Sequence, residues 1–370
     1  MSLRAGSYSC GVSAVPAPES SPDAGAIWHY GDPLGEQSAA IRDSVLIDRS
    51  NRAVITLTGA DRRSWLHSIS TQHVAQLPDG ACTENLSLDG QGRVEDHWQQ
   101  TELDGVTYLD TEPWRGEPLL AYLKKMVFWS DVQPAAADLT VLSLIGPKLA
   151  EPGILVALGL DCLPEASTAT ALAGGGFIRR TPSAPNQIEL DMLVPRERRD
   201  QWWKRLTDAG VRPAGIWTYE AHRVAALRPR LGVDTDERTI PHEVGWIGRA
   251  VHLDKGCYRG QETVARVHNL GRPPRMLVLL HLDGSDERPV TGDPVLAGGR
   301  QVGRLGTVVE HVDLGPIALA LVKRGLAADT ALSTGGEPGA GASIDADSLP
   351  AADSTGAGRL AVEKLRGRRG

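Results

Sequence analysis

Residues 253–266 read LDKGCYRGQETVAR, and this segment sets a cysteine among glycines and charged side chains. A structural cysteine usually packs among aliphatic residues, whereas Cys257 is flanked by turn formers and by Lys255 and Arg259. If either cation points at the sulfur, it favours the thiolate and makes the group more reactive. The alternative is a tight turn in which the thiol is merely small and both cations lie in solvent. The segment alone favours that alternative.

The other cysteines are scattered along the chain. Cys10, Cys82 and Cys162 form no C-x-x-C pair, and the N-terminal sequence resembles no secretory signal. This usage predicts reduced thiols in the cytoplasm, and it lacks the ligand spacing of structural zinc. No segment approaches the ~20 consecutive apolar residues that span a bilayer, so no membrane partner is expected.

Length and charge narrow the class of protein. The chain has 370 residues, of which 41% are hydrophobic and 23% charged, and these values are typical of a globular protein. Single cores stop growing at roughly 250–300 residues, so the length favours two or three structural units. The net charge of -7 argues against a protein that coats DNA or RNA electrostatically. Direct nucleic-acid binding is therefore not supported.

Composition divides the chain into four parts. Residues 1–25 are rich in Ser, Pro, Ala and Gly and predict a flexible arm. Residues 26–271 mix helical and strand patterns and predict an α+β body. Residues 272–326 contain short strands between Gly, Asp and Pro turns, which predict a small barrel or sandwich. Residues 327–370 have little apolar surface to bury and predict a disordered tail.

Periodicity locates the main elements of the body. Apolar residues recur at helical spacing in residues 117–129, 195–210 and 217–229, and in a helix that buries Trp65, Leu66 and Ile69. The expected strands of the body cover residues 53–59, 105–111, 139–146 and 187–194. Those of the late β unit cover residues 276–284, 293–309 and 316–324.

Several common active-site motifs are missing. The sequence contains no G-x-x-x-x-G-K-[ST] loop, no G-x-G-x-x-G after a strand, no H-E-x-x-H and no G-x-S-x-G elbow. His67, His73, His97 and His242 show no ligand spacing and are expected to be structural or exposed. The sequence therefore predicts neither a nucleotide-phosphate cradle nor a protein metal site.

Residues 255–262, KGCYRGQE, fit the eight-position signature K-G-C-Y-x-G-Q-E. The segment resembles the YgfZ-type folate-binding proteins, which are relatives of the aminomethyltransferase (T-protein) of the glycine cleavage system. Residues 57–97, 228–245 and 292–324 are similar to other segments of that family, so the resemblance covers about residues 45 to 325. It implies a three-lobed α+β body around a tetrahydrofolate cleft, followed by a small C-terminal β-barrel.

The resemblance also implies two reacting groups. Cys257 would be the essential thiol. Asp96, in the segment GQGRVEDH, matches an aspartate that acts at the folate in the aminomethyltransferase relatives. A carboxylate there could accept a hydrogen bond from the pterin or steer proton transfer. The alternative for Asp96 is an exposed acid beside Glu95 in a turn.

Further residues are expected to bind the cofactor. Lys255, with Arg228 and Arg230, could hold the glutamyl carboxylates through charge-assisted bonds, although an Arg-Pro-Arg turn is more often solvated. Trp246 could stack on a flat ring, although core packing is the commoner role of such a residue. The remaining cofactor-binding residues implied by the signature are Tyr258, Gly260, Gln261 and Glu262.

One position departs from the relatives. They often carry a pterin-binding glutamate in an E-A-G segment where this chain has Ala225. Ala225 cannot accept a hydrogen bond, and Glu220 lies too far round the predicted helix to replace it. Pterin recognition in the usual form is therefore in question.

Three functions follow from these features. The first is a folate-binding YgfZ-type protein that supports iron–sulfur enzymes or their assembly, and tRNA modification, through Cys257. A single thiol cannot hold a cluster by itself, so that role requires a protein partner. The second is an aminomethyltransferase that moves a one-carbon unit from a lipoyl-linked amine to tetrahydrofolate. Asp96 favours it, whereas the signature and Ala225 disfavour it. The third is a scaffold that has lost folate, which Ala225 keeps open.

Overall fold

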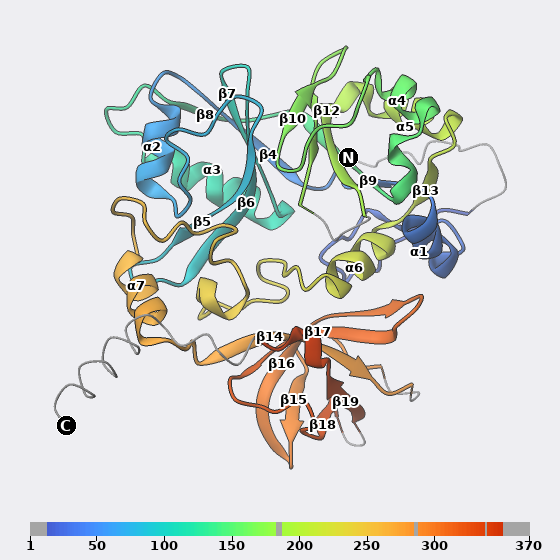
Figure 1. Ribbon diagram of the computed structural model, residues 1–370, viewed down its shortest axis with the longest axis vertical. Helices are drawn as coiled ribbons and strands as arrows, with labels where there is room; N and C mark the ends of the chain where they lie inside the picture. Colours follow the sequence, from blue (N-terminus) through green and yellow to red (C-terminus); the bar gives the residue numbers. More distant parts are fainter. Residues whose placement is uncertain (1–12, 183–186, 285–287, 337–338, 351–370) are drawn as a thin grey trace, which may run out of the picture.

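The computed structural model describes residues 13–182, 187–284, 288–336 and 339–350 of the chain. In these ranges two β-sheets lie side by side, and a closed β-barrel packs beneath them (Figure 1). A separate two-stranded ribbon is formed by β1 (Val15–Pro16) and β2 (Ile27–His29).

The first sheet has five antiparallel strands in the order β5-β6-β7-β4-β8. Its strands are β4 (Ala53–Thr58), β5 (Cys82–Leu88), β6 (Val94–Leu103), β7 (Val106–Thr111) and β8 (Gln133–Ala136). Helices α2 (Arg62–Ile69) and α3 (Gly116–Lys125) bury Trp65 and Leu119 with Trp98 in one apolar cluster of this sheet. The helix predicted over residues 117–129 is present, but it stops at Lys125, before Phe128, which has a positive φ of 46°.

The second sheet has six strands in the order β10-β11-β12-β9-β3-β13, and only β13 runs parallel to its neighbour. Its strands are β3 (Val45–Asp48), β9 (Leu139–Ile145), β10 (Ala169–Ala171), β11 (Phe177–Arg180), β12 (Glu189–Pro195) and β13 (Arg212–Ala214). Helices α4 (Pro152–Leu158) and α5 (Arg199–Asp208) pack with Leu46 and Leu142. Helices α1 (Pro33–Arg42) and α6 (Ile216–Ala225) pack on the opposite face, with Val45 and Ile47.

Six strands close the C-terminal barrel in the order β14-β17-β16-β15-β18-β19. They are β14 (Arg275–Leu282), β15 (Pro294–Ala297), β16 (Arg300–His311), β17 (Gly315–Lys323), β18 (Leu332–Thr334) and β19 (Ala340–Ile344). Helix α7 (Gln261–Leu270) precedes the barrel. The predicted α+β body with a C-terminal barrel is therefore confirmed. Within the described ranges, no helix is long and apolar enough to cross a membrane.

Two predicted boundaries differ from the structure. The part of the expected arm that is described is ordered, since Val15 pairs with His29 and Asp23 is buried. The barrel does not end at residue 326, because β18 and β19 complete it and bury Leu332 and Ile344. In both segments a few buried residues lie among many small and polar ones, so composition gave little sign of order. Residues 1–12 and 351–370 lie outside the described residues.

Candidate functional site

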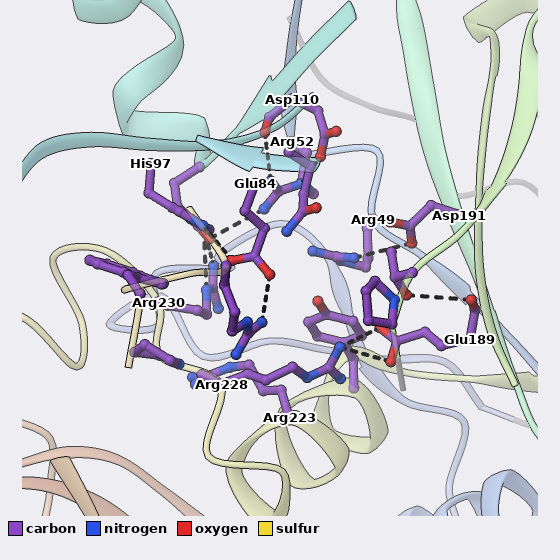
Figure 2. A pocket seen from close by; sticks show the side chains of 18 residues that line it. Arg49, Arg52, Glu84, His97, Asp110, Glu189, Asp191, Arg223, Arg228 and Arg230 are labelled. Atoms are coloured by element: carbon purple, nitrogen blue, oxygen red, sulfur yellow. Dashed lines mark hydrogen bonds and ion pairs between the residues drawn. The ribbon is translucent and has the colours of Figure 1, made fainter. Parts of the chain in front are cut away.

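A charged cavity lies where the two sheets meet helix α6 (Figure 2). The space within it that is open to the centres of water molecules is about 70 Å3, and the cavity is partly open to solvent. Strands β5, β6, β7 and β12 and the segment after α6 contribute its walls. The arginines that line it are Arg49, Arg52, Arg223, Arg228, Arg230 and Arg249. The carboxylates that line it are Glu84, Asp110, Glu112, Glu189 and Asp191.

Arg179 joins the two sheets behind this cavity. Its side chain is 1% exposed and lies 2.5 Å from Asp110 of β7 and 2.9 Å from Asp191 of β12. Arg52 adds a 2.8 Å bond to Asp110, and Arg49 lies 3.5 Å from Asp191. Because the acids belong to different sheets, this buried network fixes how the walls of the cavity face each other.

Arg230 links the N-terminal segment to the body through buried ion pairs. Its guanidinium donates to Asp23 at 2.6 Å, to Glu112 at 2.7 Å and to Glu220 of α6 at 3.1 Å. This contact holds Asp23 in place, because a buried carboxylate needs a cation nearby.

The buried acids of the cavity are held in the charged form. Burial alone would raise the pKa of Asp110, but Arg179 and Arg52 outweigh it and lower the pKa to about 2. Burial is likewise outweighed at Glu84, where His97 and Arg249 lower the pKa to about 2. These carboxylates therefore accept hydrogen bonds and do not donate them.

Arg228 retains two donors that no described residue uses. Its Nη1 atom lies 2.8 Å from both carboxylate oxygens of Glu189, which also lies 3.2 Å from His222. Against burial, Arg228 and His222 hold the pKa of Glu189 well below its usual range. The Nε and Nη2 atoms of Arg228 are buried and, within the described residues, have no hydrogen-bond partner. These two nitrogens form one edge of the guanidinium, the edge that matches a carboxylate or phosphate.

A flat aromatic pair lines another part of the wall. Trp246 stacks on His97 with ring centroids 4.8 Å apart and an interplanar angle of 15°. His97 Nε2 lies 3.0 Å from Glu84, whose other oxygen binds Arg249. Among the described residues, no group of His, Cys, Asp and Glu side chains is arranged to hold a metal ion.

The fold resembles a known enzyme structure over most of its length. The crystal structure of glycine cleavage system aminomethyltransferase T from Bartonella henselae superposes with a TM-score of 0.80. The match covers 90% of this chain and 92% of that one, at 18% sequence identity. The chain has the T-protein fold.

Sequence comparison points the same way. An aminomethyltransferase from Chromobacterium violaceum is 26% identical over 227 residues, 59% of this chain and 61% of that one. An aminomethyltransferase from Nostoc sp. is 28% identical over 317 residues, 80% of this chain and 81% of that one. The chain thus spans about three-fifths of the first relative and four-fifths of the second. No protein-family model matches it. Sequence and fold together support the T-protein superfamily.

Three of the predicted ligand-binding residues line the cavity of this T-protein fold. They are Arg228, Arg230 and Trp246. The guanidinium of Arg230 is engaged by acids. No residue from 250 to 262 is among the lining residues, so the signature segment lies outside the cavity.

Lys255 stabilises a turn of the T-protein fold. Its side chain is buried, and Nζ donates to the backbone carbonyls of His67, Ser70 and Gln72 just after α2. Burial lowers the pKa of Lys255 to about 8. The ammonium is therefore used inside the protein and does not reach a ligand in the cavity.

The other signature residues shape the same loop. Tyr258 is buried in an apolar cluster, and this burial raises its pKa to about 12. Gly260 has a φ of +83°, and a Cβ there would lie 2.6 Å from the carbonyl oxygen of Asp89. Gln261 is placed to donate to the carbonyl of Lys255 at 3.5 Å, while Glu262 is exposed on α7. The signature thus packs a loop against the β5–β6 turn.

Cys257 is exposed on this loop, as predicted for a turn. Neither neighbouring cation is directed at it, because Lys255 binds carbonyls and Arg259 pairs with Glu95 at 2.9 Å. The structure therefore does not bring the thiol and the cavity together.

Asp96 lies on the face of β6 that points away from the cavity. Its carboxylate is 3% exposed and accepts from Ser87 at 2.8 Å and from Arg115 at 2.6 Å. It is neither a cavity residue nor the exposed acid of the alternative. Side chains alternate along a strand, so the next residue, His97, faces the cavity instead.

Three polar residues that line the cavity were not predicted from the sequence: Glu189, Glu84 and His97. Ala225 packs against an apolar cluster, whereas a carboxylate is supplied to the cavity by Glu189 of β12. Strands β5 and β6 were not among the strands predicted from the sequence, so the face that Glu84 and His97 share could not be inferred.

Proposed function

We propose that this protein binds tetrahydrofolate in the charged cavity and acts as a folate-dependent one-carbon transferase or carrier. The support is the T-protein fold, the aminomethyltransferase relatives and the donor set of the cavity. When bound, the folate supplies the nitrogen atoms that carry a one-carbon unit.

The residues present fit such a ligand. A reduced folate has a planar pyrimidine ring, ring nitrogens that donate, and glutamyl carboxylates. The cavity offers the His97 ring, which is stacked on the buried Trp246, the ionised Glu189 carboxylate and the buried edge of Arg228. Ligand sites usually combine such aromatic walls with a few directed polar groups.

The unpartnered edge of Arg228 is the observation that carries the proposal. The other arginines of the cavity bind acids of the protein, whereas two buried N–H groups of Arg228 have no partner among the described residues. A buried N–H group without an acceptor destabilises the folded protein. An anionic group of a ligand would accept hydrogen bonds from both N–H groups at once.

Replacing Arg228 by Lys tests the proposal. Lysine keeps a cation beside Glu189 but lacks the two-pronged edge, so affinity for tetrahydrofolate is expected to fall roughly a hundredfold, or about 2.8 kcal/mol. Isothermal calorimetry measures this change. Arg196→Lys is the control, because Arg196 forms an exposed pair with Asp138 and does not line the cavity. A flat calorimetric trace for the unmodified protein would contradict folate binding.

We further propose that Cys257 acts on a partner protein, in support of iron–sulfur enzymes and of tRNA modification. The K-G-C-Y-x-G-Q-E signature and the exposure of the thiol support this role. Because one thiol cannot hold a cluster, the partner must supply other ligands. The location in the cytoplasm stays a prediction from the sequence.

Replacing Cys257 by Ala is expected to abolish this cellular role while leaving the melting temperature unchanged, because the side chain is small and exposed. The measurement is the activity of iron–sulfur enzymes in cells that carry only the variant. Cys162→Ala, at another exposed cysteine, is the matched control and should behave as the unmodified protein. Full enzyme activity with Cys257→Ala would remove the thiol from the mechanism.

Two alternatives are an aminomethyltransferase and a scaffold without folate, and the residue that favoured each is weaker support in the structure. Asp96 favoured an aminomethyltransferase, but it lies outside the cavity. Ala225 favoured a scaffold without folate, but Glu189 supplies a carboxylate elsewhere. An assay with an aminomethylated lipoyl carrier protein distinguishes the first alternative, and calorimetry with tetrahydrofolate distinguishes the second.

A further inference from the structure

We propose that His97 exchanges a proton with the ligand bound in the cavity and that Glu84 positions its ring. The identity of the ligand rests on the proposed function. The arrangement of the two residues does not depend on it.

The other ionisable side chains of the cavity are fixed in one protonation state. Arginines keep their protons at all ordinary pH values. The pKa values of Glu84, Asp110, Glu112 and Glu189 lie below their usual range, and Asp191 is bound to Arg179. Burial raises the pKa of Tyr219, so this phenol keeps its proton. Imidazole is the side chain that ordinarily exchanges protons near neutral pH, and His97 is the histidine among the described lining residues.

Glu84 determines which nitrogen of His97 carries hydrogen. An ionised carboxylate only accepts, so the 3.0 Å contact requires a hydrogen on Nε2. Nδ1 of the neutral ring is then an acceptor, and it has no hydrogen-bond partner within the described ranges. The orientation is fixed further by Trp246, which stacks on the ring, and by Arg249, which holds the second oxygen of Glu84 at 2.5 Å.

The proton step follows from this geometry. A protonated amine or ring N–H of the ligand gives its proton to Nδ1, and the electron pair of the broken N–H bond stays on the ligand nitrogen. The imidazole becomes an imidazolium whose charge faces the Glu84 carboxylate. A base oriented by a second group is the usual arrangement for such transfer. The site would therefore take a nitrogen base as ligand, and tetrahydrofolate is one.

The first measurement needs no ligand. Nitrogen-15 NMR of the imidazole above neutral pH is expected to show hydrogen on Nε2 of His97 in the unmodified protein. Glu84→Gln retains an acceptor oxygen and should preserve this tautomer, whereas Glu84→Leu should yield a mixture. Hydrogen on Nδ1 in the unmodified protein, or an unchanged tautomer in Glu84→Leu, would overturn the role of Glu84.

The second measurement determines how many protons are taken up or released when tetrahydrofolate binds. Tetrahydrofolate is titrated calorimetrically in two buffers of different ionisation enthalpy, and the binding heat of the unmodified protein is expected to depend on the buffer. His97→Asn should bind about tenfold more weakly and lose that dependence. His281→Asn is the matched control, because His281 forms a similar pair with Asp345 in the barrel, at 2.9 Å.

The outcomes separate the two proposals. Binding without buffer dependence, or with the same dependence in His97→Asn, would overturn proton exchange by His97. A flat trace in the unmodified protein would instead contradict folate binding, and the NMR measurement would still decide whether Glu84 orients His97.

Discussion

Replacing Arg179 by Met is expected to lower the free energy of unfolding by about 3–5 kcal/mol, because it leaves buried carboxylates without their main cation. Arg179 is 1% exposed and binds Asp110 of one sheet and Asp191 of the other. Methionine has a similar length but no charge. The decrease in the free energy of unfolding therefore measures the contribution of the ion network and not that of a cavity in the core. Chemical denaturation followed by circular dichroism measures it.

The decrease in the free energy of unfolding caused by Arg179→Met should also depend on pH. The pKa of Asp110 is about 2 in the folded protein and 3.8 in the absence of its neighbours. A depressed folded pKa contributes stability that is present above pH 4 and is lost as the pH falls towards 2. The difference between Arg179→Met and the unmodified protein should therefore shrink over that window, because a protonated Asp110 no longer needs a cation.

Arg196→Met is the control for this experiment. Arg196 pairs with Asp138 on the surface, where such pairs contribute at most about 1 kcal/mol. If both variants lost the same small free energy, the network behind the cavity would not hold the two sheets together.

Replacing Lys255 by Met is expected to cost about 3 kcal/mol, since buried carbonyls that lose their donor are not rehydrated. The ammonium serves the carbonyls of His67, Ser70 and Gln72. Its loss should also speed hydrogen exchange in the loop that carries Cys257. Hydrogen-exchange mass spectrometry measures this local opening, and denaturation measures the global cost.

This variant also separates two roles for Lys255. If the residue bound the folate carboxylates, as the sequence suggested, affinity for tetrahydrofolate would fall by orders of magnitude in the folded variant. The structure places it outside the cavity, so affinity is expected to stay within about threefold. Lys204→Met is the control, because Lys204 forms an exposed pair with Asp208.

Periodicity in the sequence predicted part of the body, and it missed other elements, among them strands β5 and β6. Helices α3, α5 and α6 and strands β4, β7, β9 and β12 lie where apolar spacing predicted them. This success has a local cause, because burial of one face imposes a period on neighbouring residues. The C-terminal barrel was predicted for the same reason, except for its last two strands, which are short and rich in small residues.

The cavity could not be predicted in this way. Arg179 and Asp110 are far apart in the chain, and each looks like a surface charge in its own segment. The error at Asp96 has a related cause, since alternation shows that Asp96 and His97 point in opposite directions but not which direction faces the cavity. Only the second sheet settles that question. The partners of Lys255 could not be predicted for another reason. They are backbone carbonyls, which every residue has, so no sequence pattern marks them.

The closure of the barrel by β19 has a consequence for synthesis of the chain. Strand β14 pairs with β19 through Leu280 and Ile344, so its partner leaves the ribosome about 60 residues later. Until then a nascent chain presents the open backbone edges of β14 and β18, which invite pairing with another chain. Premature termination within the last strands should therefore yield aggregates, even though the α+β body upstream has already been synthesised.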